Sequence, residues 1–177
     1  GKIITLNIGS TGTVNASEFY PNGTKADNTP GTGDIVGINI AAGGVLNVSK
    51  IADFRNATQT VAGAGTFTLA WGGKLRIGSV AGISASAATG PIQTTTRNFS
   101  TGAAYAYEGV AAQVSGNGLP ATIGALIINN ALGLTLSGSS TANDSLTLTN
   151  GVITATSSEV LTLGTPAIVS VGSTASH

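Results

Sequence analysis

Few residues in this sequence could act as nucleophiles or general bases. It contains one histidine, His177, which is the last residue, and no cysteine. A Ser-His-Asp or Cys-His arrangement needs a histidine that the fold holds in place, and chain ends are poorly held. We therefore expect no catalytic residue and predict that the chain is not an enzyme.

Seven acidic residues are the other candidates for catalysis or metal binding. A glycosidase needs two carboxyl groups close together, but the acids are dispersed, and only Asp27 and Asp34 flank a common loop. Neither an EF-hand loop nor a Gly-Gly-x-Gly-x-Asp repeat is present. With Asn22 and Asn28, the loop offers at most a weak metal site, so we predict no metal centre and no cofactor. The acidic residues are Glu18, Asp27, Asp34, Asp53, Glu108, Asp144 and Glu159.

Three aromatic residues could instead contact a carbohydrate, because a flat ring stacks on the face of a sugar. Trp71 falls at a corner between two strand-like segments, and Tyr105 and Tyr107 share one face of another such segment. For the two tyrosines the alternative is that their rings replace an aliphatic pair inside the core.

The elements that must position these residues form a repeat. Six times, two triplets of the pattern apolar-x-apolar are separated by a short, Gly-rich corner. Alternation with period two predicts β-strands, and its recurrence predicts strands stacked as repeated units. We expect Ile8, Ile40 and Leu69 to be equivalent, and likewise Ile128, Leu148 and Leu163. The paired triplets are 6–8 and 14–16, 38–40 and 46–48, 67–69 and 75–77, 126–128 and 134–136, 146–148 and 153–155, and 161–163 and 169–171.

These patterns predict an all-β fold, a right-handed parallel β-solenoid with short strands and Gly-rich corners. An antiparallel β-sandwich is the alternative, because short strands with Gly turns also suit it. A single array is expected over 1–177, with a soft internal boundary near 116–120. Turn-forming residues predict an external loop over 19–33, and a second insertion covers 79–91.

Composition limits the classes of partner. Charged residues make up 8% of the chain and the net charge is zero, so nothing attracts it to nucleic acid. Hydrophobic residues make up 41% and alternate with polar ones, which argues against disorder. Since no apolar run approaches the ~20 residues of a membrane-spanning helix, we expect no membrane insertion.

More than half of the sequence resembles the repeat region of large secreted, adhesin-like β-solenoid surface proteins of Bacteroidetes. This resemblance implies secretion and an extracellular or cell-surface location. It also implies O-glycosylation at Ser145, because Asp144-Ser145-Leu146 matches the Asp-Ser/Thr-apolar acceptor of these bacteria. The segments that carry the resemblance are 67–78, 82–83, 89–93, 112–120, 126–130, 133–137 and 146–151.

The function expected is that of an extracellular structural protein, a fibre or filament subunit that joins end to end through its terminal strands. The partner would then be a second copy of the chain. The first alternative is a monomeric adhesin stalk segment that binds glycans or surfaces. A polysaccharide-degrading enzyme ranks below it, and an ice-binding protein ranks last, because Thr-x-Thr does not recur at one coil position. The residues expected in the joining strands are Ile3, Ile4 and Leu6 at one end and Ile168, Val169 and Val171 at the other.

Overall fold

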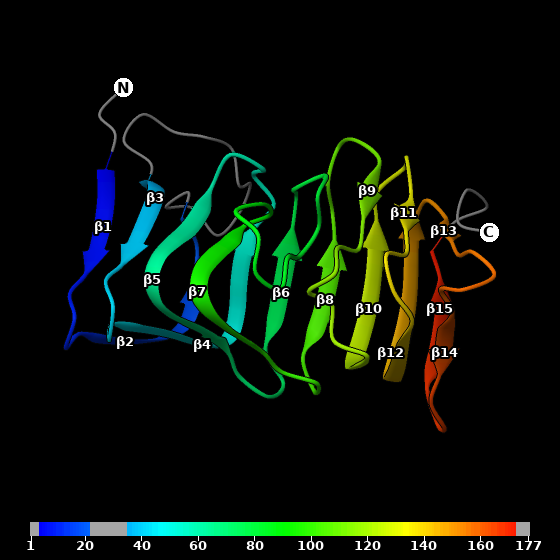
Figure 1. Ribbon diagram of the computed structural model, residues 1–177. Helices are drawn as coiled ribbons and strands as arrows, with labels where there is room; N and C mark the ends of the chain where they lie inside the picture. Colours follow the sequence, from blue (N-terminus) through cyan, green and yellow to red (C-terminus); the bar gives the residue numbers. More distant parts are fainter. Residues whose placement is uncertain (1–3, 22–34, 173–177) are drawn as a thin grey trace.

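The structure, a computed structural model, describes residues 4–21 and 35–172. In this part the chain forms fifteen strands and no helix, and the strands follow one another along a row (Figure 1). The prediction of an all-β chain is confirmed. The strands are β1 Ile4–Ile8, β2 Thr13–Phe19, β3 Ile35–Ile40, β4 Val45–Phe54, β5 Thr60–Leu69, β6 Lys74–Ile77, β7 Ile92–Phe99, β8 Ala104–Tyr107, β9 Gln113–Val114, β10 Thr122–Asn129, β11 Leu134–Thr135, β12 Ser140–Asn150, β13 Ile153–Thr154, β14 Leu161–Leu163 and β15 Ile168–Val171.

Every strand pair recorded in the described residues is parallel. Twelve strands form one sheet, in the order β1-β3-β5-β4-β6-β8-β10-β12-β14 with β2, β7 and β15 attached, and β13-β11-β9 form a second sheet. Parallel neighbours cannot be joined by a tight hairpin, so the chain must travel back before each new pairing. The antiparallel β-sandwich is therefore wrong.

The pairing divides the strands into three series. The first series contains β1, β3 and the first halves of β5 and β7. The second contains the first halves of β2 and β4 and the second halves of β5 and β7. The third contains the ends of β2 and β4, followed by β6, β8, β10, β12 and β15. Long strands such as β4 thus pass from one series to the next without interruption.

The core consists of columns of apolar side chains that neighbouring strands place on top of one another. In the third series, Leu75, Tyr105 and Leu126 are consecutive partners, and all three are fully buried. The Tyr105 hydroxyl donates a hydrogen bond to the Ser100 carbonyl at 2.8 Å, and the Tyr107 hydroxyl donates to the Ser115 carbonyl at 2.7 Å. The interpretation of these tyrosines as an aromatic step within the stack is confirmed.

The corners between strands are shaped by glycine where the backbone needs a positive φ. Gly43 has φ +83, and a Cβ at this position would collide with the Ser10 carbonyl oxygen of the preceding corner. Because stacked corners lie this close, a larger residue there would push neighbouring strands apart.

Two expected equivalences are wrong, those of Leu69 and Leu163. Ile8 pairs with Ile40 and Ile128 pairs with Leu148, as predicted. Leu69, however, pairs with Val48 and not with Ile40. The corner at 41–44 joins the first series to the second, whereas the corner at 70–73 joins the second to the third. Two corners of similar sequence therefore occupy different positions, and Leu163 likewise pairs with Ala142 rather than Leu148.

The predicted insertions behave differently from one another. Phe19 ends β2, and its ring centroid lies 6.0 Å from that of Phe54, while residues 22–33 of the predicted loop lie outside the described residues. In the second insertion, Ile83 is fully buried, and its backbone N–H donates to the Ser115 carbonyl at 3.0 Å. The segment 79–91 therefore lies beside β9 and contributes to the core.

Candidate functional site

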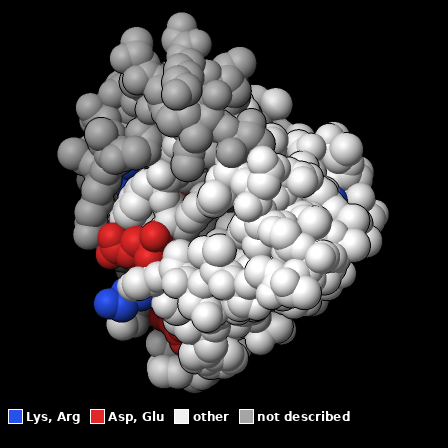
Figure 2. Space-filling view, turned by 90° about the vertical axis from the view of Figure 1, so that its left-hand side faces the viewer, with Lys and Arg blue, Asp and Glu red and all other residues white. Residues whose placement is uncertain are grey.

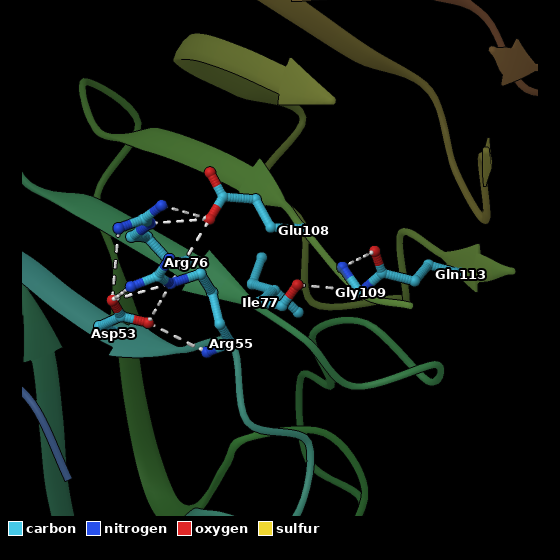
Figure 3. A network of polar contacts seen from close by, with 7 residues as sticks. All are labelled: Asp53, Arg55, Arg76, Ile77, Glu108, Gly109 and Gln113. Atoms are coloured by element: carbon cyan, nitrogen blue, oxygen red, sulfur yellow. Dashed lines mark hydrogen bonds and ion pairs between the residues drawn. The ribbon is translucent and has the colours of Figure 1, made fainter. Parts of the chain in front are cut away.

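Charged side chains that are distant in the sequence meet on the outside of the third series (Figure 3). The register places Asp53 of β4 beside Arg76 of β6, and Arg55 and Glu108 follow β4 and β8. Arg55 Nη2 lies 2.8 Å from Asp53 Oδ2, and Arg76 Nη2 lies 2.7 Å from Glu108 Oε2. Cross contacts of 3.4 Å between Arg76 and Asp53 and 3.7 Å between Arg55 and Glu108 complete the charged cluster.

The expectation that the acidic residues are dispersed is wrong for Asp53 and Glu108. Both carboxylates contact the same two guanidinium groups, and Asp53 is fully buried. The hydrogen bond to Asp53 raises the pKa of Arg55 above its ordinary value, against the smaller effect of burial. Since both carboxylates are engaged by the two guanidinium groups, neither is free to act as a nucleophile. The geometry is that of a network of ion pairs that joins β4, β6 and β8, and it suits stabilisation of the strand stack better than catalysis.

A second polar network lies inside the stack. Gln113 Nε2 donates to the carbonyl oxygens of Ile77 and Ser79 at 3.0 and 2.9 Å, and its Oε1 accepts from the Gly109 N–H at 2.9 Å. Asn130 Nδ2 also donates to Gln113 Oε1, at 2.9 Å. Both side chains are buried and satisfied. The Gln113 and Asn130 side chains satisfy backbone N–H and carbonyl groups where the chain passes from the third series to β9, so their role is structural.

The surface around these networks carries little charge. Figure 2 shows the N-terminal end of the row, where acidic and basic side chains gather on one side of a largely uncharged surface. Within residues 4–21 and 35–172, no three His, Cys, Asp or Glu side chains come together as a metal site. The weak metal site suggested by Asn22, Asp27, Asn28 and Asp34 lies outside the described residues.

The three aromatic candidates for a sugar contact differ in their exposure to solvent. Tyr105 and Tyr107 are fully buried, so the prediction that their rings meet a carbohydrate is wrong. They fill core positions because their register partners are Leu75, Ile77 and the aliphatic residues of β10. Trp71 is 77% exposed at its corner.

The C-terminal end of the strand row exposes apolar side chains. β14 ends the strand order of the large sheet, and β15 is recorded with β12 as its partner. Beside them lies a groove of about 680 Å³ between β12, β13 and β14. Exposed apolar residues in this region include Val160, Leu163, Ile168, Val169 and Val171. The groove is lined by Leu146, Leu148, Val152, Ile153, Ala155, Thr156, Glu159, Val160 and Leu161.

The N-terminal end also has strands with one recorded partner. β1 begins the strand order and pairs with β3, and β2 pairs with β4. Leu6, Val14 and Phe19 are partly buried and pack against the core. Of the predicted joining residues, Ile4 and Leu6 lie in β1, while Ile3 lies outside the described residues.

The predicted glycosylation residue lies within a strand. Ser145 of β12 is half-buried and stands between Ala125 and Ile168 in the register. Its modification stays a prediction from the resemblance.

Comparisons with protein-family models, with curated proteins and with solved structures found no match for this chain. The part of the chain that the structure describes holds no helix of the length and apolarity that crossing a membrane requires.

Proposed function

We propose that this chain is an extracellular structural protein, a right-handed parallel β-solenoid that joins end to end into a cell-surface fibre. The observation that carries the proposal is the apolar C-terminal end. There the strands β14 and β15 continue the columns of the core, but their side chains are exposed.

The strand pairing supports the solenoid. The chain returns repeatedly to the same series, or from β9 onward to the sheet β13-β11-β9, and each return adds a strand parallel to the previous one. Connections between parallel strands of one sheet are right-handed in the great majority of proteins. Stacked units of this kind hold together through backbone hydrogen bonds and need few charges and no disulfides.

The charged cluster supports a role other than catalysis. Its carboxylates are held by Arg55 and Arg76, and their contacts run between neighbouring strands. Such a ladder stabilises a rod without offering a free acid and base.

The occupant we propose for the C-terminal end is the N-terminal end of a second copy. In the described part of the chain, β14 and β15 at the C-terminal end pair with β12 on one side only. At the N-terminal end of the same part, β1 pairs with β3 and β2 pairs with β4, also on one side only. Stacking one end on the other adds parallel strands to β14 and β15, with Val169 meeting Phe19, the first residue of its own column, and Leu163 meeting Val14. Because the two surfaces differ, the contact is heterologous, and because each copy would be added along the direction of the strand row, the expected product is an open filament and not a ring.

The extracellular location and the relation to Bacteroidetes surface proteins rest on the sequence resemblance. The low charge and the alternating strands agree with that class. Identification of the native protein at the cell surface, by surface proteolysis or immunogold labelling, would test this part separately from assembly.

The assembly experiment uses two variants that each block one end. Val169→Lys places a charge on the C-terminal end, and Val14→Lys places one on the N-terminal end. Val110→Lys is the matched control, because Val110 is 97% exposed and belongs to neither end. We expect filaments in electron microscopy from the wild type and the control, and monomers from each blocked variant. An equimolar mixture of the two blocked variants should give dimers, because one intact joint remains.

Three results would contradict this proposal. A wild-type chain that stays monomeric at high concentration favours the stalk alternative. Dimers of Val14→Lys alone mean that C-terminal ends pair with each other. Filaments of Val169→Lys mean that the C-terminal end is not the joint.

A further inference from the structure

We propose that Trp71, together with a column of Asn and Thr side chains beside it, forms a binding site for a neutral polysaccharide. Trp71, Thr68 and Asn98 lie between the two ends of the strand row, and only Asn15 of β2 belongs to the N-terminal end, so binding at Trp71 does not depend on the proposed assembly.

The indole of Trp71 has a fixed position. A Cβ at Gly102 would collide with the indole ring carbons, so the ring lies directly against the Gly102 backbone of the next corner. The Gly72 N–H donates to the Gly102 carbonyl at 3.1 Å, which joins the two corners, and the Gly73 N–H donates to the Ala70 carbonyl at 3.0 Å, which closes the corner of Trp71 itself. The ring is therefore supported from below while 77% of the residue stays exposed. A rigid aromatic surface of this kind binds with little loss of conformational entropy.

The polar column lies on the outside of the second series. The register places Asn15, Asn47, Thr68 and Asn98 in consecutive strands. Asn47 Nδ2 donates to Asn15 Oδ1 at 2.8 Å, and Asn98 Nδ2 donates to Thr68 Oγ1 at 3.2 Å. An amide has two N–H donors and an oxygen with two lone pairs, so each side chain keeps groups that can bind hydroxyls. Neighbouring strands repeat these groups every ~4.8 Å.

The Trp71 indole and the polar column of Asn15, Asn47, Thr68 and Asn98 are close to each other. Thr68 precedes Trp71 by three residues, which limits their Cα separation to roughly 10 Å. Asn98, the register partner of Thr68, precedes Gly102 by four residues on the next strand and corner. One sugar ring stacked on Trp71 thus places the following rings of an extended chain over the exposed amide of Asn98 and the hydroxyl of Thr68.

The column carries amides and hydroxyls but no ionised group, which favours a neutral ligand rich in hydroxyls. Basic residues do occur nearby: Lys50 is exposed in β4, Lys74 follows Trp71 by three residues, and the Arg97 guanidinium donates to the carbonyl oxygens of Thr94 and Ser84. Attraction of an acidic polymer to Lys50 would be weakened by salt. Binding of a neutral chain through stacking and hydrogen bonds should be insensitive to salt.

The test uses the fact that Trp71 is the one tryptophan of the chain, so its emission reports this site alone. The 177-residue chain is titrated with cellohexaose, mannohexaose, xylohexaose and chitohexaose, and with polygalacturonate as the acidic arm. The Val169→Lys variant is titrated in parallel, so that assembly and binding are separated. We expect a saturable change of emission with at least one neutral oligosaccharide, unchanged by ~0.5 M NaCl.

Variants measured by calorimetry sharpen the assignment. Trp71→Ala should weaken binding roughly 10- to 30-fold, the range for loss of a central aromatic contact. Asn98→Ala should weaken it a few-fold, and Val110→Ala should leave it unchanged. Gly102→Ala should displace the indole and weaken binding while Trp71 itself is retained. Thermal unfolding of each variant establishes that the fold is intact.

Each of four results would overturn the proposal. These are no response to any neutral oligosaccharide, response to polygalacturonate alone, undiminished binding by Trp71→Ala, and an emission change that depends on protein concentration without sugar. The last would assign the ring to packing between copies of the chain.

Discussion

The middle and the C-terminal end of the third strand series contain similar residues in very different surroundings. Leu126 of β10 and Val169 of β15 belong to one column, linked through Leu146 of β12. Leu126 is fully buried, but Val169 is 49% exposed and its neighbour in the strand, Val171, is 52% exposed. The difference is that β10 has strands on both sides. Burial in this fold is therefore supplied by the next strand along the row, and an end remains incomplete until something adds a strand to it.

The largest effect expected from this difference compares Leu126→Ala with Val169→Ala. Loss of the Leu126 side chain should reduce the free energy of unfolding by about 3 kcal/mol, because a cavity remains among strands that cannot collapse. Loss of the Val169 side chain from the monomer should reduce it by less than about 1 kcal/mol, because the site already faces solvent. Urea unfolding of both variants, at concentrations where the chain is monomeric, measures the two values.

Comparison of Leu126→Ala with Val169→Ala also shows whether another strand covers β15 in solution. If Val169→Ala costs as much as Leu126→Ala in dilute solution, a strand already covers β15 and the comparison between middle and end fails. If the cost of Val169→Ala rises with protein concentration while that of Leu126→Ala stays constant, the added strand comes from a second copy.

Sequence alternation was sufficient to find most of the strands and several of their partners, but the predicted triplets did not include β7 or β9. The pairing of 126–128 with 146–148 could be predicted because a short return separates two similar segments. The exposed end was partly predictable, since Ile168, Val169 and Val171 form the expected last strand. The burial of Tyr105 and Tyr107 could not be decided from their types, because a tyrosine suits a core column and a sugar contact equally.

The errors have one physical origin. β4 passes from the second series to the third through Ser49 and Lys50, without a Gly-rich corner, so the sequence hides that turn. Aligning the Gly-rich corner at 41–44 with the one at 70–73 therefore assigns Leu69 to the first series with Ile40, although it lies in the second series and pairs with Val48. The charged cluster was missed for the same reason, because Asp53 and Arg76 become neighbours only in the correct register. Placing the apolar-Asp-apolar triplet of β4 on the apolar-Arg-apolar triplet of β6 is the signal that could have revealed it.

A second prediction compares a carboxylate in the stack with one at the open end. Asp53→Asn should lower the free energy of unfolding by about 2 kcal/mol, because a buried acceptor of two guanidinium groups is lost. Partial exposure of Arg55 and Arg76 limits the cost, since water can solvate them. Glu159→Gln, at the rim of the groove, should change stability by less than about 0.5 kcal/mol. Denaturant unfolding measures both, and equal costs would show that the charged cluster does not fasten the strands.

The smallest effect expected is the pH dependence of stability that Tyr105 and Tyr107, buried in the middle of the third series, produce. Burial raises the pKa of Tyr105 and of Tyr107 above the ordinary value of 10.0. Below pH 10.0 both phenols are protonated in the folded and the unfolded chain, so their contribution is fully present. Above pH 10.0 the unfolded chain releases protons that the folded chain keeps, so stability falls by up to about 1.4 kcal/mol per pH unit for each tyrosine.

Tyr107→Phe separates this titration from the packing of the ring. At neutral pH the variant should lose about 1 kcal/mol, because the Ser115 carbonyl loses the hydroxyl donor at 2.7 Å but keeps the Ile83 N–H. Between about pH 10 and 11.5 its stability should fall less steeply with pH than that of the wild type. Val171→Ala, at the open end of the same column, should keep the wild-type slope. If Tyr107→Phe leaves the slope unchanged, the phenol ionises as readily in the folded chain as in the unfolded one. The middle of the column would then be open to water, and the contrast between middle and end would be one of neighbours alone and not of solvent access.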